Sequence, residues 1–193
     1  MNQIVDKLLE FVFLLMLVQM IVFVIFLRAS KISVSGTAPI NPILFKLAKV
    51  AMFACWIAVY VQSSGYYRLS LWGNQFVCVS IAAFFFLFGF ILQCIAYFNL
   101  GKNLKFGIPD INEQKTLTLR TTGIYRFSRN PMYAGFFLMT IAAGLYVLNP
   151  VVWIFAIFTL WVHHAIVLGE ERYLQQTFGK QWDEYTKRVR RYL

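Results

Sequence analysis

The sequence predicts an all-α integral membrane protein with about five transmembrane helices, and three observations support this fold class. Hydrophobic residues make up 60% of the 193 residues, charged residues make up only 13%, and the mean hydropathy is +0.64. Soluble domains carry about 25% charged residues. The apolar residues also form runs of about 20 residues, the length of a helix that crosses a bilayer. Most of the chain is therefore expected to be solvated by lipid.

Five apolar runs define the predicted spans. Each must be helical, because lipid offers no partner for backbone amide and carbonyl groups. The runs cover residues 8–27, 43–62, 76–98, 132–148 and 151–168. The first run is too long for a signal peptide and lacks a small-residue cleavage site, so it is retained as a span. Lys46 and Lys49 stand at the start of the second run, where their ammonium groups can reach the interface.

The basic residues predict the orientation of these spans, since Lys and Arg collect in cytoplasmic loops. When alternate loops are placed on opposite sides, all 18 Lys and Arg residues except Lys7 and Arg68 fall on one side. Five spans then place the N-terminus outside and the C-terminus in the cytoplasm. The net charge of +10 belongs to these loops, so no nucleic-acid partner is expected.

The chain reads as one structural domain in two regions. Residues 1–98 hold three transmembrane helices, and residues 99–193 hold a polar loop, a helical hairpin and a C-terminal helix. The loop at 99–131 is broken by Gly and Pro but carries interleaved apolar residues, which favours a folded connector over a solvated linker. Any chemistry is expected in the second region, on the cytoplasmic side.

The C-terminal segment has the pattern of an amphipathic helix. Trp182, Tyr185, Val189 and Tyr192 recur at helical spacing among basic residues. This pattern predicts a helix that lies on membrane lipids of the anionic cytoplasmic leaflet. A plain basic tail is the alternative.

The last two spans are separated by Asn149 and Pro150 alone, so they must form a tight antiparallel hairpin. Asn130 and Gly169 are equally distant from the turn along the two arms. At about 1.5 Å of rise per residue, both arms have travelled about 30 Å and emerge together at the same membrane face. Residues 129–133 are therefore expected beside residues 170–172.

The hairpin brings together complementary polar groups. They are an amide, a phenol and two carboxylates next to a helix N-terminus, from Asn130, Tyr133, Glu170, Glu171 and Pro131. An ammonium group would favour the carboxylates, and an anion would favour the helix N-terminus, so the set can hold a zwitterion. A structural ion pair between either Glu and Arg126 or Arg129 is the alternative.

Two motifs that flank this hairpin resemble a known family. The run TTGIYRFSRNPMYAGF at 121–136 and the run GEERYLQQTFGKQWDEYTKRVRRYL at 169–193 are similar to the isoprenylcysteine carboxyl methyltransferase family. That family belongs to a wider group of membrane methyltransferases that includes the phospholipid methyltransferases. The resemblance covers about residues 100–193, and the first three spans match it only in hydrophobicity.

The resemblance implies an S-adenosyl-L-methionine site without a Rossmann domain, and no GxGxxG motif is present in the sequence. The cofactor-binding positions that it implies are Leu117, Thr118, Leu119, Arg120, Tyr125, Asn130, Pro131, Met132, Tyr133 and Glu170. This mixture of residues agrees with a ligand that joins amino and carboxylate groups to an adenine ring.

The activity that the resemblance implies is methylation of a lipophilic or prenylated substrate that enters from the bilayer. Such a displacement needs donor and acceptor held about 3 Å apart with water excluded, and it needs no metal. A carboxylate or thiolate acceptor needs no base, whereas an amine does, and Glu171 and His164 are the candidates. His164 lies seven residues before Glu171, on roughly the same helix face, and it can orient Glu171, contact the substrate or form an interhelical hydrogen bond.

Two positions depart from the family pattern and leave the acceptor open. Asn130 stands where the family has His, and Ile166 stands where the prenylcysteine enzymes have an Arg attributed to binding the substrate carboxylate. The alternatives are therefore a phospholipid amine N-methyltransferase and a non-enzymatic membrane protein that retains the scaffold, with a sterol-reductase relative more remote. The three Cys residues are isolated in apolar runs, so no metal site is expected. The sequence does not address the oligomeric state.

Overall fold

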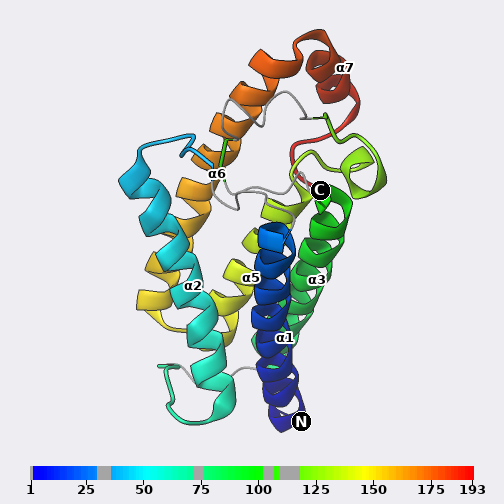
Figure 1. Cartoon of the computed structure of the whole chain (residues 1–193). Helices are drawn as coiled ribbons and strands as arrows, with labels where there is room; N and C mark the ends of the chain where they lie inside the picture. The colour runs from blue at the N-terminus through cyan, green and yellow to red at the C-terminus, as the bar shows by residue number, and fades with distance from the viewer. Residues whose placement is uncertain (1, 30–35, 72–75, 102–106, 109–117) are drawn as a thin grey trace.

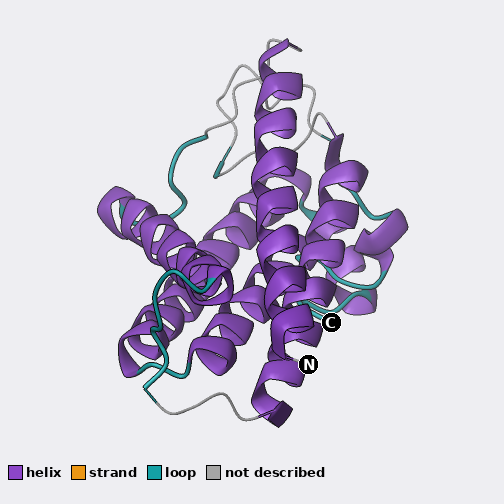
Figure 2. Ribbon diagram, turned by 90° about the horizontal axis from the view of Figure 1, so that it is seen from below, coloured by secondary structure: helices purple, strands orange, loops and turns teal. Residues whose placement is uncertain are grey.

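Helices make up almost all of the described chain (Figure 1). The computed structural model describes residues 2–29, 36–71, 76–101, 107–108 and 118–193. The elements are α1 (Asn2–Ala29), α2 (Pro42–Ser64), α3 (Phe76–Leu100), the short 3-10 helix η2 (Gly123–Arg126), α5 (Pro131–Val147), α6 (Pro150–Phe178) and α7 (Lys180–Arg188). Within these ranges there is no strand, only two isolated bridges (Figure 2). The predicted all-α class is confirmed.

The helices have the length and the apolar surface of membrane-spanning helices. Among the described residues, α1, α2, α3 and α6 are long and apolar enough to cross a membrane, and α5 is a shorter apolar helix of 17 residues. Large apolar side chains point outward along these helices, among them Phe11, Val50, Phe84 and Ile157. Soluble monomers do not expose apolar surface on this scale. The chain is therefore a multi-pass integral membrane protein, as predicted from its five apolar runs.

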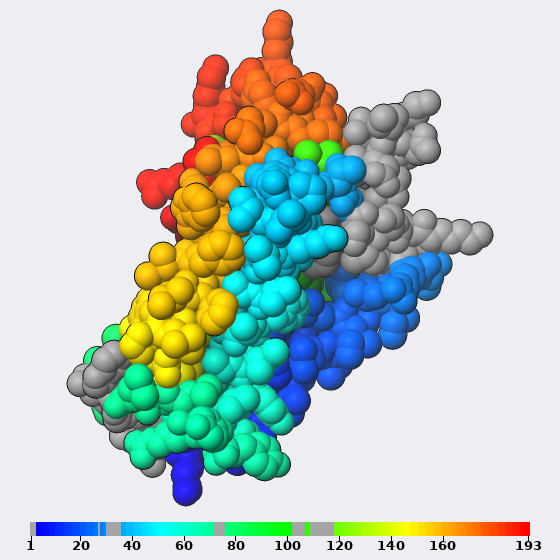
Figure 3. Space-filling model, turned by 90° about the vertical axis from the view of Figure 1, so that its left-hand side faces the viewer, coloured from blue at the N-terminus to red at the C-terminus, as the bar shows by residue number. Residues whose placement is uncertain are grey.

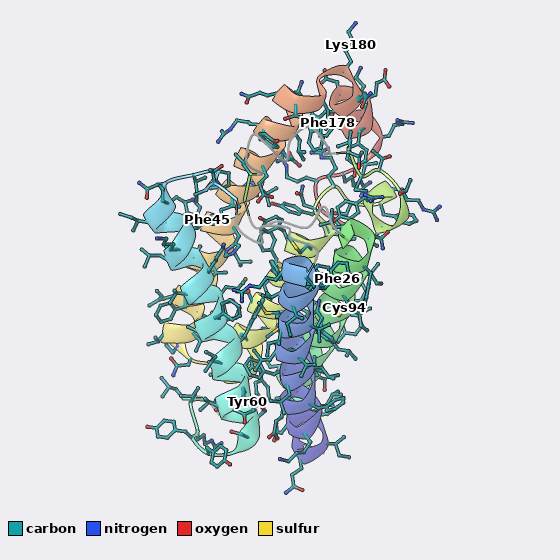
Figure 4. All side chains as sticks on the ribbon, in the orientation of Figure 1. Phe26, Phe45, Tyr60, Cys94, Phe178 and Lys180 are labelled. Carbon is teal, nitrogen blue, oxygen red and sulfur yellow. The ribbon has the colours of Figure 1, made fainter. Side chains whose placement is uncertain are left out.

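Helix α2 packs beside α6, and α1 lies against α2 and α3. The space-filling view in Figure 3 shows α2 and α6 adjacent along one face of the molecule. The N-terminus lies at one end of the bundle, and the C-terminus lies towards the other (Figure 1). Figure 4 places Tyr60 near the first of these ends, and Phe178 and Lys180 at the second, where α6 meets α7.

A turn of two residues joins α5 to α6. Leu148 adopts a left-handed conformation with φ of 48°, and its backbone N–H donates to the carbonyl of Gly144. The Asn149 side chain accepts a hydrogen bond from the backbone N–H of Val151 at 2.9 Å and donates to the carbonyl of Leu69 at 2.8 Å. The predicted hairpin is confirmed. Helix α6 runs on to Phe178, ten residues past the predicted end of the last span, because hydropathy marks the apolar part of a helix and not its terminus.

Helices α3 and α5 approach closely through two glycines. A Cβ atom built on Gly89 would lie 2.7 Å from the carbonyl oxygen of Gly135, and one built on Gly135 would lie 2.5 Å from that of Gly89. Small residues allow such backbone contact between membrane helices. This contact fixes the position of α5, which carries the first half of the site.

Replacing Gly135 with Leu is expected to lower the free energy of unfolding by about 1–3 kcal/mol, because the side chain has to displace the α3 backbone. Thermal denaturation in detergent measures the effect as a lower Tm. Val77→Leu on α3 is the control, since Val77 is 62% exposed. Equal melting temperatures for the two variants would contradict the close contact.

Candidate functional site

The hairpin places two polar clusters in direct contact at its open end. The Tyr133 hydroxyl, at the start of α5, donates a 2.8 Å hydrogen bond to the Glu170 carboxylate on α6. The Asn130 amide, just before α5, donates at 2.8 Å to the Glu171 carboxylate. The predicted juxtaposition of residues 129–133 with residues 170–172 is confirmed. The two neighbouring carboxylates have different surroundings.

Glu170 faces the interior of the bundle. Besides the Tyr133 hydroxyl, its carboxylate receives a hydrogen bond from the backbone of Gly107 and interacts electrostatically with Lys49 on α2. The segment at 36–40 packs over this region, with Thr37 and Ile108 exchanging backbone hydrogen bonds of 2.8 and 2.9 Å. Glu170 is half-buried. Its carboxylate therefore lies beneath the connecting segments that contain residues 36–40 and Gly107, and it points toward the interior of the helix bundle.

Glu171 is held in an ion-pair network. Arg129 Nε lies 3.1 Å from one carboxylate oxygen, and Arg191 Nε lies 2.9 Å from the other. Together with Asn130 and a longer contact from Arg129 Nη2 at 3.4 Å, four hydrogen bonds converge on this carboxylate. Glu171 is 8% exposed. The structural ion pair considered from the sequence is present between Arg129 and Glu171.

The C-terminal segment is part of the same network. The other nitrogen of the Arg129 guanidinium, Nη1, donates to the carbonyls of Thr186 and Val189 at 3.3 and 2.8 Å. The backbone N–H groups of Arg129 and Asn130 donate to the carbonyls of Arg190 and Arg191. A guanidinium at the carbonyl end of a helix also has favourable electrostatics there. Arg129 thus fastens the end of α7 to the start of α5.

The apolar face of α7 is turned inward. Trp182 and Tyr185 are 5% and 3% exposed, packed against Leu119, Leu174 and Phe178. The Tyr185 hydroxyl donates to the Tyr125 carbonyl at 2.6 Å, and burial raises the pKa of Tyr185 to about 12. The expectation that these aromatic residues lie on lipid is wrong, because an amphipathic pattern does not distinguish a protein surface from a bilayer. The helix also ends at Arg188, so Val189 and Tyr192 do not continue it. Contact of its basic face with a leaflet stays a prediction.

A cavity of about 110 Å³ lies between α3, η2, α6 and α7. It is lined by Leu100, Thr118, Leu119, Arg120, Tyr125, Arg129, Leu174, Trp182 and Tyr185. The predicted cofactor residues Thr118, Leu119, Arg120 and Tyr125 are thus brought together, whereas Leu117 lies outside the described residues. Aromatic, aliphatic and guanidinium groups share the wall. Hereafter this is the polar-end cavity.

A glycine shapes one wall of this cavity. Gly123 has φ of 62°, and a Cβ there would collide with the Asn99 side chain. The Asn99 side chain accepts a hydrogen bond from the backbone N–H of Ile124 at 3.4 Å, which ties η2 to the end of α3. Tyr125, two residues after the glycine, is thereby held in the buried position that it occupies.

A second cavity, of about 200 Å³, lies inside the bundle. Hereafter this is the bundle cavity. The four long apolar helices and the shorter α5 all contribute to its wall, with Met20 from α1, Trp56 from α2, Tyr97 from α3, Phe136 from α5 and Ile166 from α6. Tyr133, His163 and Lys49 also line it. The lining is almost entirely apolar and aromatic, as in sites for lipophilic ligands.

Tyr125 lies close to Glu170, at the inner side of the polar-end cavity. It lines the polar-end cavity, and the nearby Glu170 carboxylate, which accepts the Tyr133 hydrogen bond, disfavours ionisation of its phenol. Burial holds the pKa of the Tyr125 phenol well above its ordinary value, so it stays protonated and neutral. Tyr125, on the wall of the polar-end cavity, Tyr133, on the wall of the bundle cavity, and Glu170, near both, are hereafter called the partition.

The remaining predicted residues take positions around this partition. Pro131 and Met132 are buried in the first turn of α5. The amide of Asn130 is bonded to Glu171 and to the Arg191 carbonyl, the latter at 3.3 Å. His164 Nδ1 lies 2.8 Å from the Tyr192 hydroxyl, so this ring contacts the C-terminal segment. The catalytic roles predicted for Glu171 and His164 stay predictions.

Several residues of the site were not found from the sequence. Trp56 and Tyr97 looked like ordinary apolar positions, and Gly107 was one glycine among several in a loop. Trp182 and Tyr185 were placed on a C-terminal helix lying on the membrane surface and not in the wall of a cavity. Lys49 did carry a signal, since a basic residue within an apolar run costs free energy in a membrane and is kept where it faces the protein interior.

The fold and the site together define a class of protein: a multi-pass membrane protein with a cavity among polar groups at one end of its bundle and an apolar cavity within the bundle. Residues 77–181 match the family model described as phospholipid methyltransferase. This match covers more than half of the chain and includes Tyr133, Glu170 and Glu171. The chain therefore belongs to the phospholipid methyltransferase family.

Within this family, the chain is similar to several proteins named as protein-S-isoprenylcysteine O-methyltransferases. The chain is 32% identical over 104 residues to protein-S-isoprenylcysteine O-methyltransferase B of Arabidopsis thaliana, covering 53% of this chain and 52% of that protein. It is 29% identical over 114 residues to the Saccharomyces cerevisiae protein-S-isoprenylcysteine O-methyltransferase, covering 58% and 47%. The protein of that name in Dictyostelium discoideum is 28% identical over 141 residues, covering 72% and 56%. The chain spans about half the length of these relatives. No solved structure matches it.

Proposed function

We propose that this chain is a membrane-embedded methyltransferase that uses S-adenosyl-L-methionine to methylate a lipophilic acceptor, similar to the isoprenylcysteine carboxyl O-methyltransferases. One observation supports the proposal: the chain has a polar-end cavity, lined by Tyr125, and an apolar bundle cavity, lined by Tyr133, and Glu170 lies near both tyrosines. A reaction between a polar donor and a lipid-soluble acceptor needs two such compartments. The family membership and the relatives' names support the same reaction class.

The residues around the polar-end cavity fit this cofactor by the chemistry of their groups. Arg120 lines the cavity and supplies a guanidinium for a carboxylate. Glu170 does not line the cavity but lies near Tyr125, which does, and its carboxylate can bind an amino group. Leu119, Leu174 and Trp182 offer apolar and aromatic surface for an adenine ring. When bound, the cofactor supplies a methyl group made electrophilic by its sulfonium.

The chain's own residues position the reactants and exclude water. The Tyr133 hydroxyl orients the Glu170 carboxylate, and the apolar wall of the bundle cavity keeps the acceptor dry. Alignment and desolvation of this kind are the main requirements of a methyl displacement. A carboxylate acceptor needs no proton removed. The four hydrogen bonds on Glu171 and the Tyr192 contact of His164 accord with this choice, since neither group is then needed as a base.

The proposed topology follows the distribution of basic residues. The site and the C-terminus lie in the cytoplasm, the N-terminus lies outside, and the acceptor enters from the bilayer. A phospholipid amine N-methyltransferase is the second candidate, because the matching family model carries that description. That reaction would require Glu171 or His164 to accept a proton.

Methyl transfer by the purified protein tests the proposal. With tritiated S-adenosylmethionine, label is expected in N-acetyl-S-farnesyl-L-cysteine as a base-labile methyl ester. Label in monomethyl-phosphatidylethanolamine vesicles instead would establish the second candidate. No transfer to either acceptor, together with no cofactor binding by calorimetry, would leave a non-enzymatic membrane protein and refute both candidates.

A further inference from the structure

Lys49 places an ammonium group in the wall of the bundle cavity. Among the described residues that line this cavity, it is the one that carries a formal charge. Its Nζ atom lies 3.9 Å from the centroid of the Phe45 ring, which also lines the cavity, and the side chain is half-buried. A Lys within a membrane helix is costly, and it faces the protein interior, where it pairs with other groups or marks the path of a substrate; Glu170 is one charged neighbour of Lys49. An otherwise apolar cavity with one cation suits a lipophilic anion.

The position of Lys49 relative to the partition is informative. Tyr133 and Ile166 line the same cavity, and Glu170, the hydrogen-bond partner of Tyr133, interacts electrostatically with Lys49. The ammonium group is therefore at the end of the bundle cavity that adjoins the polar compartment. An anionic group held there would be next to the proposed methyl donor, with its apolar tail among Met20, Met52 and Trp56.

We propose that Lys49 binds the carboxylate of a single-chain lipophilic acceptor and thereby selects acids over their neutral analogues. This inference rests on the proposed function for the reaction and adds the residue that determines acceptor charge. The carboxylate oxygen forms a bond to the methyl carbon as the methyl–sulfur bond breaks, and the electron pair stays on sulfur, so no proton moves. The product ester is neutral and loses its attraction to Lys49, which favours release.

The volume of the bundle cavity indicates what kind of ligand it can hold. A volume of about 200 Å³ is below the usual range of about 300–1,000 Å³ for ligand pockets, which favours one narrow chain over two acyl chains. Ile166 lies in the same wall, on α6. A cation placed at Ile166 would therefore serve the same cavity from the neighbouring helix, so the charge can be relocated as a test.

Equilibrium binding of radiolabelled N-acetyl-S-farnesyl-L-cysteine and of its methyl ester to the detergent-solubilised protein measures the role of Lys49. Lys49→Met is expected to weaken binding of the acid by about 10- to 100-fold, as for loss of a charge-assisted contact, and to leave the ester unaffected. Lys49→Arg keeps the preference for the acid. Lys49→Met combined with Ile166→Arg restores it. Lys46→Met is the matched control, because Lys46 is exposed one turn earlier on α2 and does not line the cavity.

Equal affinity of the wild-type protein for acid and ester would overturn the inference. So would an equal loss of both ligands in Lys49→Met, which would indicate a structural role, or Lys49-dependent binding of monomethyl-phosphatidylethanolamine in place of the acid. The binding measurement does not depend on turnover. A protein that prefers the acid through Lys49 but transfers no methyl group would refute the proposed function while supporting this inference.

Discussion

Replacing Arg129 with Met is expected to destabilise the protein by about 3–5 kcal/mol, the cost of removing one partner from a buried ion pair. The side chains of Arg129 and Glu171 are only 10% and 9% exposed. The change removes both contacts to the Glu171 carboxylate and the two hydrogen bonds to the carbonyls of Thr186 and Val189. A loss of this size is a large share of the stability of a domain. A lower Tm in detergent and easier proteolysis of residues 180–193 are the measurements.

A double variant separates the ion pair from the packing. Arg129→Met combined with Glu171→Leu is expected to recover part of the lost stability, because it removes a buried carboxylate that keeps only Arg191 and Asn130 as partners in the single variant. Arg191 can then turn to solvent, since its side chain is already 37% exposed. Arg126→Met is the control, because Arg126 is exposed and contacts only the neighbouring Phe127 ring among the described interactions. If the double variant is as unstable as the single variant, the ion pair between Arg129 and Glu171 is not what attaches the C-terminal segment to the start of α5.

Glu170→Gln is expected to lower S-adenosylmethionine affinity by about 10- to 100-fold, equivalent to about 1.5–3 kcal/mol for a hydrogen bond to a charged group. The substitution preserves size but removes the charge that would bind the amino group of the donor. Methyl transfer at subsaturating donor should fall by a similar factor. Tyr133→Phe should have a smaller effect in the same direction, because it leaves the carboxylate in place and removes the 2.8 Å hydrogen bond that orients it. Calorimetry on purified protein measures both.

Glu184→Gln provides the matched control for this effect. Glu184 is an exposed carboxylate on α7, so its substitution should change neither affinity nor Tm. A Glu170→Gln protein that keeps its Tm and binds the donor as tightly as wild type would place the amino-group site elsewhere. A lowered Tm together with unchanged affinity would assign Glu170 a purely structural role.

The open end of the hairpin was predictable because helix geometry leaves little freedom. A two-residue turn and a fixed rise per residue place Asn130 level with Gly169, and this arithmetic holds whichever side chains are present. The sequence did not determine which carboxylate and which guanidinium in this cluster form the ion pair. The sequence allowed either Glu to pair with either Arg126 or Arg129, and the structure pairs Glu171 with Arg129 because Glu170 faces the opposite way, toward Tyr133.

Contributions from distant segments could not be predicted from residue spacing. Lys49 reaches the site because α2 packs beside α6, and apolar periodicity does not reveal which helices are neighbours. The bridge between Thr37 and Ile108 joins loops 71 positions apart, each without a pattern of its own. Trp182 was misplaced for a related reason: its helix is amphipathic in either environment, and only the tertiary structure shows that its apolar face meets Leu174.

The attachment of the C-terminal segment also sets an order of events during synthesis. Ser128 and Arg191, joined by a 3.4 Å hydrogen bond, are 63 residues apart in the chain. At about 5–20 residues per second, the ribosome adds Arg191 roughly 3–13 s after Ser128. Helices α5 and α6 therefore leave the ribosome before Arg190 and Arg191 can pair with residues 128–130. The polar corner can therefore form only after both arms of the hairpin and residues 190–191 have been synthesised.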